Sequence, residues 1–219
     1  MSLDYSRRLY RKFNQIKWSQ KFPYSTYNKK RNCIFIHIPK VAGTSVLDSI
    51  AGRRAKRNHL PWYVYYTANP PFYNKAFKFS FVRNPWDRAV SAYRYLESGG
   101  NQTSDLEVAK LVSKYRDFDD FVVDGLGEGL FRSHLLFIPQ SEFVINGEQK
   151  LAVDFLGRFE NIDQDFEKVL CQLDIRARLE KTNASTRNID YREYYKKEKT
   201  VDIISSIYKQ DVSFFSYEF

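Results

Sequence analysis

The chain has 219 residues, of which 43% are hydrophobic and 17% aromatic, and this composition excludes an intrinsically disordered polypeptide. The length suits one domain with a sizeable core, whereas two full domains would be cramped. The 35 Lys and Arg residues exceed the 26 Asp and Glu residues and give a net charge of +9. That surplus favours an anionic partner, such as a nucleotide, a nucleic acid, an acidic glycan or a membrane surface.

Cysteine, histidine and apolar patterns argue against three further classes. Cys33 and Cys171 are too few for a disulfide framework and fit a reducing compartment. The histidines are scattered and no Cys-x-x-Cys occurs, so we expect no metal site. No apolar run approaches the roughly 18 residues of a membrane span, and no signal-peptide core precedes the chain's first strand. We therefore expect no integral membrane segment and a cytoplasmic protein, unless a membrane anchor has been removed.

The first predicted elements lie before residue 52. Residues 1–31 are basic and aromatic, and they predict a partly helical N-terminal extension. Residues 33–38 form a continuous apolar run, which indicates a buried parallel strand. A helix then opens at Gly43 or Thr44, because apolar residues recur at helical spacing over 46–50.

A second strand–loop–helix unit follows the first. A loop rich in proline and asparagine leads to an apolar strand at residues 77–82, which Asn84-Pro85 ends. A helix over about residues 86–96 comes next. Two such units in succession predict an α/β fold with a mainly parallel sheet flanked by helices.

The rest of the chain predicts a hairpin among helices. Residues 142–145 and 151–155 are typical of two strands joined by a turn at Asn146-Gly147. No internal repeat is present, so residues 32–219 are predicted to form a single domain. The predicted helices of this part cover residues 105–115, 117–123, 162–173, 191–197 and 201–212.

The loop after the first strand has the residues of an anion site. A helix N-terminus there would direct backbone N–H groups and partial positive charge at one spot. Gly43 lets an anion approach the backbone closely, Thr44 and Ser45 add hydroxyl donors, and Lys40 adds a mobile charge. The Lys precedes the Gly, so this is not a Walker A loop, and a magnesium-dependent NTPase is disfavoured. The competing interpretation is an ordinary turn, with Thr44 as N-cap and Lys40 at the surface.

A second anion site is predicted at the end of the second strand. Arg83 ends that strand, and Ser91 follows eight residues later in the next helix. A guanidinium suits bidentate binding of phosphate, and a serine hydroxyl can complete the site. The alternative is that Arg83 forms an ion pair with Asp87 and that Ser91 has no special role.

Together the two segments resemble the nucleotide-binding signatures of carbohydrate sulfotransferases. The first reads Ile-Pro-Lys-Val-Ala-Gly-Thr-Ser at residues 38–45, and the second reads Phe-Val-Arg-Asn-Pro-Trp-Asp-Arg-Ala-Val-Ser-Ala-Tyr at residues 81–93. The most similar group contains the heparan 2-O-, chondroitin and dermatan enzymes and their bacterial relatives. The similarity continues through residues 157–161, residues 183–186 and the spacing Tyr208-x-x-Asp211-x-x-x-Phe215.

The resemblance implies a PAPS-dependent sulfotransferase fold with a P-loop-like sheet. It implies metal-independent transfer of a sulfuryl group from 3′-phosphoadenosine 5′-phosphosulfate (PAPS) to a carbohydrate hydroxyl, with 3′-phosphoadenosine 5′-phosphate (PAP) as product. Arg83 and Ser91 would hold the 3′-phosphate. Where many relatives carry Thr, this chain has Val41, which lacks the hydroxyl but keeps the backbone N–H. The residues implied for the 5′-phosphosulfate are Lys40, Val41, Ala42, Gly43, Thr44 and Ser45.

A histidine is the expected base that accepts the proton of the attacking hydroxyl, because its pKa near 6.5 suits that role. We expect His59, because relatives of the heparan 2-O type place a catalytic histidine at a comparable position. His37 lies in the first strand and is expected to be a packed, hydrogen-bonded residue. His134 and Arg187 are expected on the acceptor side. A carboxylate, or His134 itself, remains an alternative base, and Lys40 would also stabilise the leaving phosphate.

The acceptor and two rival functions stay open. An acidic polysaccharide or a glycolipid fits the resemblance, and a small glycoside or a protein tyrosine is not excluded. One rival is a catalytically inactive protein of the same fold that binds nucleotides or sulfated glycans. The other is a basic nucleic-acid-binding protein, which we disfavour because the cations are dispersed and no recognition motif is present. We therefore expect no nucleic-acid partner.

Overall fold

A computed structural model describes residues 22–52, 55–100, 105–179 and 189–219. They form two compact units, each built from two stretches of the chain. The first unit comprises the described residues within Met1–Val82 and Glu142–Asn183. The second comprises those within Arg83–Ser141 and Ala184–Phe219. The single domain over residues 32–219 stays a prediction, and most of the N-terminal extension lies outside the described residues.

The first unit is built on a parallel sheet of three strands in the order β1-β2-β3. These are β1 (Cys33–Phe35), β2 (Phe77–Val82) and β3 (Phe155–Arg158), and both neighbouring pairs run parallel. The side chains of β1 are all buried, as are those of β2 after Phe77. Burial on both faces explains why β1 lies in a continuous apolar run. The predicted α/β fold with a parallel sheet is confirmed.

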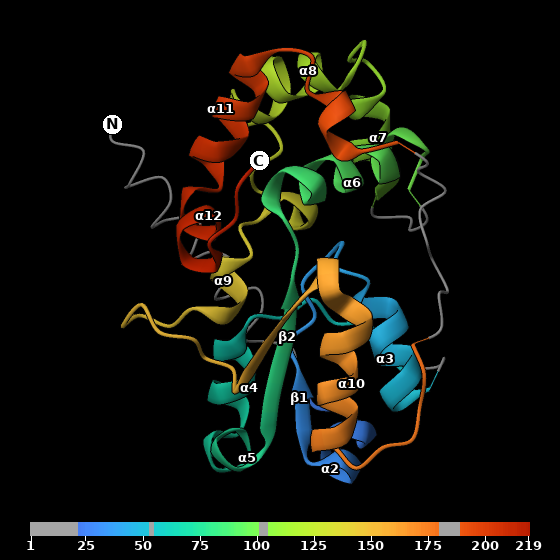
Figure 1. Cartoon of the computed structure of the whole chain (residues 1–219), viewed down its shortest axis with the longest axis vertical. Helices are drawn as coiled ribbons and strands as arrows, with labels where there is room; N and C mark the ends of the chain where they lie inside the picture. Colours follow the sequence, from blue (N-terminus) through green and yellow to red (C-terminus); the bar gives the residue numbers. More distant parts are fainter. Residues whose placement is uncertain (1–21, 53–54, 101–104, 180–188) are drawn as a thin grey trace. The chain divides into compact units, whose positions relative to one another are not determined.

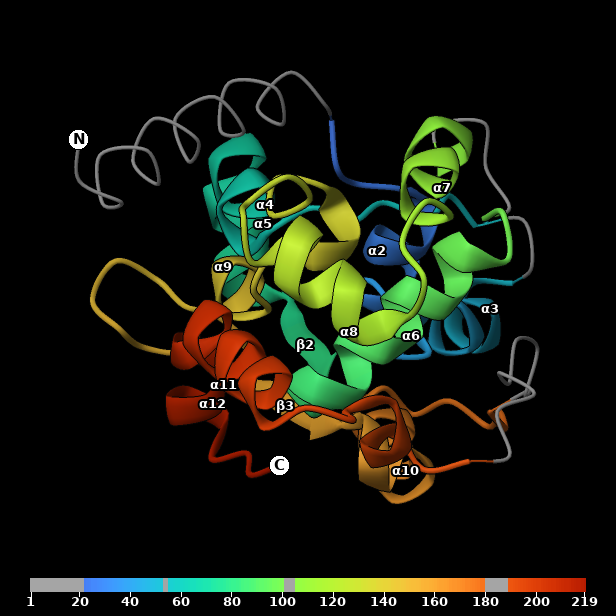
Figure 2. The same cartoon turned by 90° about the horizontal axis from the view of Figure 1, so that it is seen from above.

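Helices flank this sheet. In both views α4 and α5 lie to one side of β2 and α3 lies to the other (Figure 1 and Figure 2). Helix α10 contacts β3, and α2 contacts β1. The helices that begin in the first unit are α2 (Thr26–Arg31), α3 (Gly43–Ala51), α4 (Trp62–Ala68), α5 (Pro70–Lys75), the 3-10 turn Phe159–Asn161 and α10 (Ile162–Gln172).

The second unit is helical. Helix α6 (Pro85–Glu97) contacts α7 (Leu106–Val112) and α11 (Glu198–Ile207). Its core contains the aromatic rings of Tyr93 and Phe121, whose centroids lie 5.2 Å apart. The remaining helical segments are α8 (Phe118–Asp120), the π-helix Phe121–Leu126, the 3-10 turns Leu135–Phe137 and Tyr191–Tyr194, and α12 (Lys209–Phe215).

The first strand is shorter than the apolar run predicted. β1 ends at Phe35, although residues 36–38 are still buried. The backbone N–H of Ile36 donates to the carbonyl of Phe79 at 2.9 Å, and the Ser80 hydroxyl donates to the carbonyl of Ile36 at 2.6 Å. A side chain therefore takes the acceptor that the next ladder bond would need.

Two predictions of local structure were wrong. The loop expected between the two strand–loop–helix units contains α4 and α5, because Asn69 caps α5 and proline occupies its first position, which favours a helix start. The hairpin expected over residues 142–155 is absent. Instead α9 (Ser141–Val144) is followed by a single antiparallel bridge between Ile145 and Leu151, and β3 begins only at Phe155.

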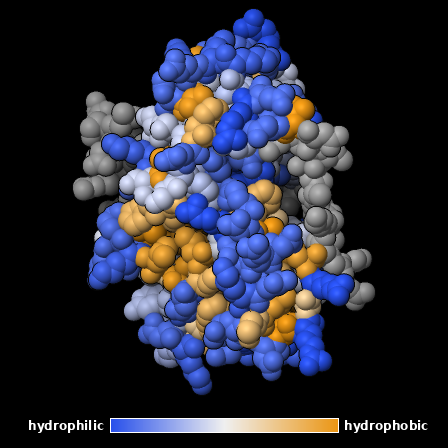
Figure 3. Space-filling model, viewed as in Figure 1, coloured by the Kyte–Doolittle hydropathy of each residue, from blue (hydrophilic) through white to orange (hydrophobic). Residues whose placement is uncertain are grey.

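The other predicted elements agree with the structure to within a few residues. β2 matches the expected strand, and α10 and α6 match the expected helices closely. The segment predicted as one helix over 201–212 is broken at Tyr208 into α11 and α12. No helix among the described residues is both long and apolar enough to cross a membrane. Hydrophilic side chains separate the apolar patches on the visible face (Figure 3).

Candidate functional site

The turn between β1 and α3 is the candidate anion site of the first unit. Helix α3 begins at Gly43, and its N-cap is Ala42, which makes no side-chain capping hydrogen bond. The alternative in which Thr44 is the N-cap is therefore wrong, because Thr44 is already the second helical residue. The first N–H groups of a helix need partners from outside the helix, and they carry partial positive charge. An anion suits this position.

Left-handed backbone conformations shape the same turn. Lys40 has φ 69° and Ala42 has φ 59°, although neither is glycine. Such conformations are uncommon for residues with a Cβ and tend to occur at functional sites. Val41 between them is fully buried, and Lys40 is half-buried at the turn. Burial of the Val41 side chain thus fixes the turn. Lys40 lies three residues before the first residue of α3 and places its positive charge in the turn.

Gly43 is required by its contact with His37. A Cβ placed at Gly43 would overlap the imidazole of His37 at Cδ2 and Nε2. Only a residue without a side chain allows the helix start to lie against this ring. The glycine that the sequence suggested for close approach of an anion is therefore also needed for packing against His37.

His59 lies beside His37. The two ring centroids are 4.2 Å apart, and His59 Nδ1 lies 2.9 Å from the backbone carbonyl oxygen of His37. A carbonyl oxygen only accepts, so Nδ1 of His59 carries the proton in this hydrogen bond. In the neutral ring the lone pair then belongs to Nε2. His59 therefore has the tautomer in which Nε2 can accept a proton, as a general base must.

His37 is a buried, uncharged histidine. Its side chain is enclosed, and its Nδ1 has no hydrogen-bond partner among the described residues. Burial lowers the pKa of His37 well below its ordinary value, and the positive charge of neighbouring His59 and Arg57 lowers it further. We predicted a packed, hydrogen-bonded residue. The packing is confirmed, and the hydrogen bond is made by its backbone carbonyl.

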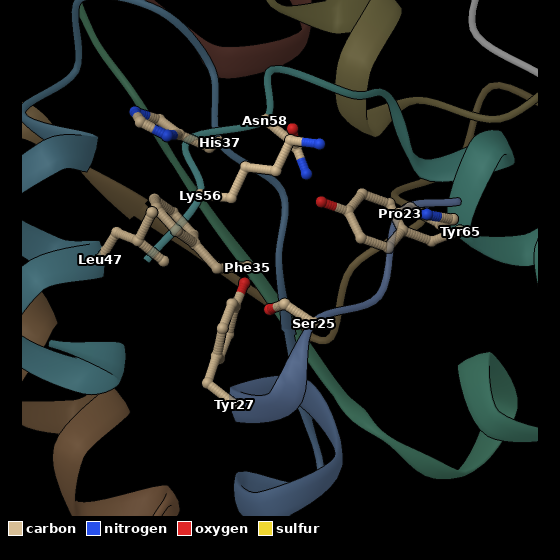
Figure 4. A pocket seen from close by; sticks show the side chains of 9 residues that line it. All are labelled: Pro23, Ser25, Tyr27, Phe35, His37, Leu47, Lys56, Asn58 and Tyr65. Carbon is tan, nitrogen blue, oxygen red and sulfur yellow. The ribbon is translucent and has the colours of Figure 1, made fainter. Parts of the chain in front are cut away.

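A small pocket adjoins these residues, but it is not a nucleotide site. It is lined by residues of β1, α2, α3 and α4 together with His37 and Lys56 (Figure 4). The Tyr65 hydroxyl points toward its middle, whereas the His37 imidazole is turned away (Figure 4). The space of about 10 Å³ admits about one water molecule. The pocket therefore has room for solvent only.

The second predicted anion site belongs to the second unit. Arg83 follows β2 directly and is 6% exposed, and its Nε lies 2.7 Å from Asp87 Oδ2. Asn84 caps α6 by accepting from the backbone N–H groups of Trp86 and Asp87. Ser91 is half-buried two turns further along this helix. The ion pair between Arg83 and Asp87, which was the alternative interpretation of this segment, is thus present. It engages Nε of a guanidinium that has five N–H donors in all.

Gln140 holds the backbone of Arg83. Its Oε1 accepts from the backbone N–H of Arg83 at 2.9 Å, and its Nε2 donates to the carbonyl of Arg83 at 2.7 Å. Asp211 in turn accepts from the backbone N–H groups of Gln140 at 2.7 Å and Ser141 at 2.8 Å. Both Gln140 and Asp211 are fully buried. This chain of contacts positions the peptide of Arg83.

Gln140 and Asp211 were not among the predicted site residues. Asp211 belongs to the Tyr208-x-x-Asp211 spacing noticed in the sequence, so a signal existed for it. No sequence signal pointed to Gln140, because its partner Arg83 lies 57 residues earlier in the chain.

Of the two acceptor-side candidates, the structure describes only His134. His134 belongs to the second unit, where its Nε2 lies 3.9 Å from Asp105 Oδ1. Burial lowers the pKa of His134, although the Asp105 carboxylate acts in the opposite direction. Arg187 and residues 183–186 lie outside the described residues. The described residues contain no group of three or more metal-ligating side chains.

The structure therefore brings together Lys40, the turn through Ser45, His37 and His59 in the first unit. Arg83 and Ser91 belong to the second unit, and so does His134.

Comparison with known proteins gave one match. A family model described as the sulfotransferase family matches residues 24–218, which is nearly the whole chain. Neither the search of curated proteins nor that of solved structures found a match.

Proposed function

Because the chain belongs to the sulfotransferase family, we propose that it transfers a sulfuryl group from PAPS to a hydroxyl of a carbohydrate. Its parallel three-stranded sheet flanked by helices is the α/β sulfotransferase fold. Family membership carries the general activity, sulfuryl transfer. The donor, the acceptor and the residue roles are parts of the proposal.

The observation that carries the proposal is the turn between β1 and α3. Lys40 precedes a helix start that has no side-chain cap, and this combination favours a group with several negative charges. We assign the 5′-phosphosulfate to Lys40, to the backbone of Val41 and Ala42, and to Gly43 through Ser45. Arg83 and Ser91 are assigned to the 3′-phosphate, because a guanidinium held by Asp87 is pre-oriented for such an anion.

His59 is the proposed base. The acceptor oxygen attacks sulfur, the bond between sulfur and the 5′-phosphate oxygen breaks, and the acceptor proton passes to Nε2 of His59. PAP leaves with the electron pair of the broken bond. The hydrogen bond from Nδ1 to the His37 carbonyl supports this role, since it places the lone pair at Nε2. Lys40 stabilises the charge on the departing phosphate, and losing one such donor costs about 10²–10³ in rate.

Labelled PAPS tests the proposal. We would measure transfer of ³⁵S to heparosan, chondroitin and a glycolipid by the wild type, His59→Asn and His134→Asn. Asparagine at position 59 can still donate to the His37 carbonyl but cannot act as a base. Transfer should fall by about 10²–10⁴ in His59→Asn and stay near wild type in His134→Asn. The reverse pattern would make His134 the base. PAP binding without transfer to any acceptor would favour the inactive binding protein.

A further inference from the structure

An open groove of about 430 Å³ lies in the first unit, outside the turn between β1 and α3. Three aromatic residues, Trp62, Tyr66 and Tyr73, are among those that line it. The ring centroids of Trp62 and Tyr66 lie 6.2 Å apart, and those of Tyr66 and Tyr73 lie 5.6 Å apart. The volume falls within the range typical of small-ligand sites. The three rings therefore pack against one another along a groove large enough for a ligand, with Tyr73 buried edge-to-face against Tyr66.

Hydrogen bonds hold two of these rings in place. Trp62 Nε1 donates to the carbonyl of Ile145 at 3.0 Å, and the Tyr73 hydroxyl donates to the carbonyl of Ala152. Ala152 itself lines the groove, and Ile145 directly precedes the lining residue Asn146. Tyr66 is 41% exposed and so offers its ring to solvent. A preorganised surface of this kind loses little conformational freedom when a ligand stacks on it.

Asp154 supplies a fixed acceptor beside the rings. Its Oδ2 accepts from the backbone N–H of Lys78 at 2.8 Å and from Lys78 Nζ at 2.9 Å. Its Oδ1 has no hydrogen-bond partner among the described residues, and 47% of the side chain is exposed. The carboxylate is thus oriented by one oxygen and can accept a ligand's hydroxyl with the other.

Asn146 supplies the complementary donor. Its Oδ1 accepts from the backbone N–H groups of Glu148 and Lys150 at 3.0 and 2.9 Å. Its Nδ2 has no partner within the described part of the chain. The groove therefore offers one carboxylate acceptor and one amide donor next to aromatic faces. Sugar hydroxyls both donate and accept, and the C–H face of a pyranose ring stacks on aromatic rings.

The charge of the groove indicates which sugar it suits. Lys78 and Asp154 form an ion pair, so their charges cancel, and the more exposed member is the carboxylate. This carboxylate would repel an anionic sugar, whereas a neutral sugar would not be repelled. Trp62 lies three residues after His59, so their Cα atoms are at most about 11 Å apart. A chain bound in the groove would thus extend from the neighbourhood of the proposed base.

We propose that this groove binds a neutral saccharide segment of the acceptor. The assignment to the acceptor rests on the proposed function, whereas saccharide binding itself does not. The test uses cellotetraose, maltotetraose and mannotetraose as neutral probes and a heparosan tetrasaccharide as the anionic one. Binding is measured by saturation-transfer NMR and titration on the wild type, Tyr66→Ala, Tyr66→Phe and Phe22→Ala. Phe22 is the matched control, because it is an aromatic residue that is 70% exposed and does not line the groove.

We expect at least one neutral probe to bind, with affinity about threefold to tenfold weaker in Tyr66→Ala. Tyr66→Phe keeps the ring and should stay near wild type, as should Phe22→Ala. If none of the three neutral probes binds, the proposal is overturned. It is also overturned if Tyr66→Ala binds them with the affinity of the wild type, or if the heparosan tetrasaccharide binds more tightly than they do and depends on Tyr66. PAP is titrated into the same samples. Saccharide binding without PAP binding would overturn the donor assignment and leave the groove standing.

Discussion

Gln140 offers the sharpest test of how Arg83 is held. The substitution Gln140→Leu roughly keeps the volume of a fully buried side chain and removes both hydrogen bonds to the Arg83 peptide. The backbone N–H and C=O of Arg83 each lose a buried hydrogen bond, at about 1–3 kcal/mol each. We therefore expect the free energy of unfolding to fall by about 2–6 kcal/mol. At about 2–4 °C per kcal/mol for a chain of this size, Tm should drop by about 4 °C or more.

Gln140→Glu should make the loss depend on pH. The glutamate can still accept from the backbone N–H of Arg83, but only its protonated form can donate to the Arg83 carbonyl. Burial and the facing carbonyl raise the pKa of this carboxyl in the folded state above the ordinary value of about 4.3. The stabilising contact is therefore present at low pH and lost as pH rises through the folded-state pKa. The variant should approach wild type at pH 5 more closely than at pH 8.

Thermal unfolding followed by circular dichroism at both pH values measures these effects. Gln172→Leu is the control, because Gln172 is an exposed residue of α10. Affinity for PAP is measured on the same variants and should fall in Gln140→Leu. If Gln140→Leu melts at the same temperature as Gln172→Leu, the contacts to Arg83 do not stabilise the protein and the reasoning fails.

Two further predictions concern His37. Gly43→Ala should lower the free energy of unfolding by about 1–3 kcal/mol, because the new Cβ overlaps the His37 ring. Gly147→Ala, which meets no atom within 4 Å, should leave Tm unchanged, and equal Tm values for the two variants would contradict the packing. The lowered pKa of His37 means that only the unfolded chain binds its proton. The free energy of unfolding should therefore decrease as pH is lowered below about 6.5, by up to about 1.4 kcal/mol per pH unit. Urea denaturation at pH 7.5 and 5.5 measures this, and His37→Met should weaken the dependence. An unchanged slope in that variant would show that other groups cause it.

Two strands of the sheet, β1 and β2, could be predicted because they are buried on both faces. β2 was predicted to the residue, since phenylalanines at alternate positions followed by Val82 lie between a polar loop and Asn84-Pro85 and leave little choice of boundary. β1 was predicted too long, because the hydroxyl of Ser80, which lies on another strand, takes the carbonyl of Ile36. That competition depends on pairing between strands and leaves no mark in the local pattern.

The errors around the site have a similar cause. The start of α9 is stabilised by Asp211, which accepts from the backbone N–H of Ser141 across 70 residues of sequence. A local reading of the apolar residues after Ser141 therefore favoured a strand. The candidate residues Lys40, Gly43 and His59 came from motif and resemblance. The contact between His37 and Gly43 and the hydrogen bond that sets the His59 tautomer needed three-dimensional placement.

The central claim is that Arg83 holds an anion of the sulfuryl donor, and titration of PAP tests it most directly. Calorimetry would compare the wild type, Arg83→Ala and Arg94→Ala at two salt concentrations. Arg94 lies on α6, the helix that follows Arg83, with its side chain 53% exposed and paired with Glu97, so it is a matched control. We predict micromolar binding to the wild type and to Arg94→Ala, and an affinity about tenfold to a hundredfold weaker in Arg83→Ala, checked to be folded. No binding of PAP to the wild type, or the same affinity in all three proteins, would contradict the account.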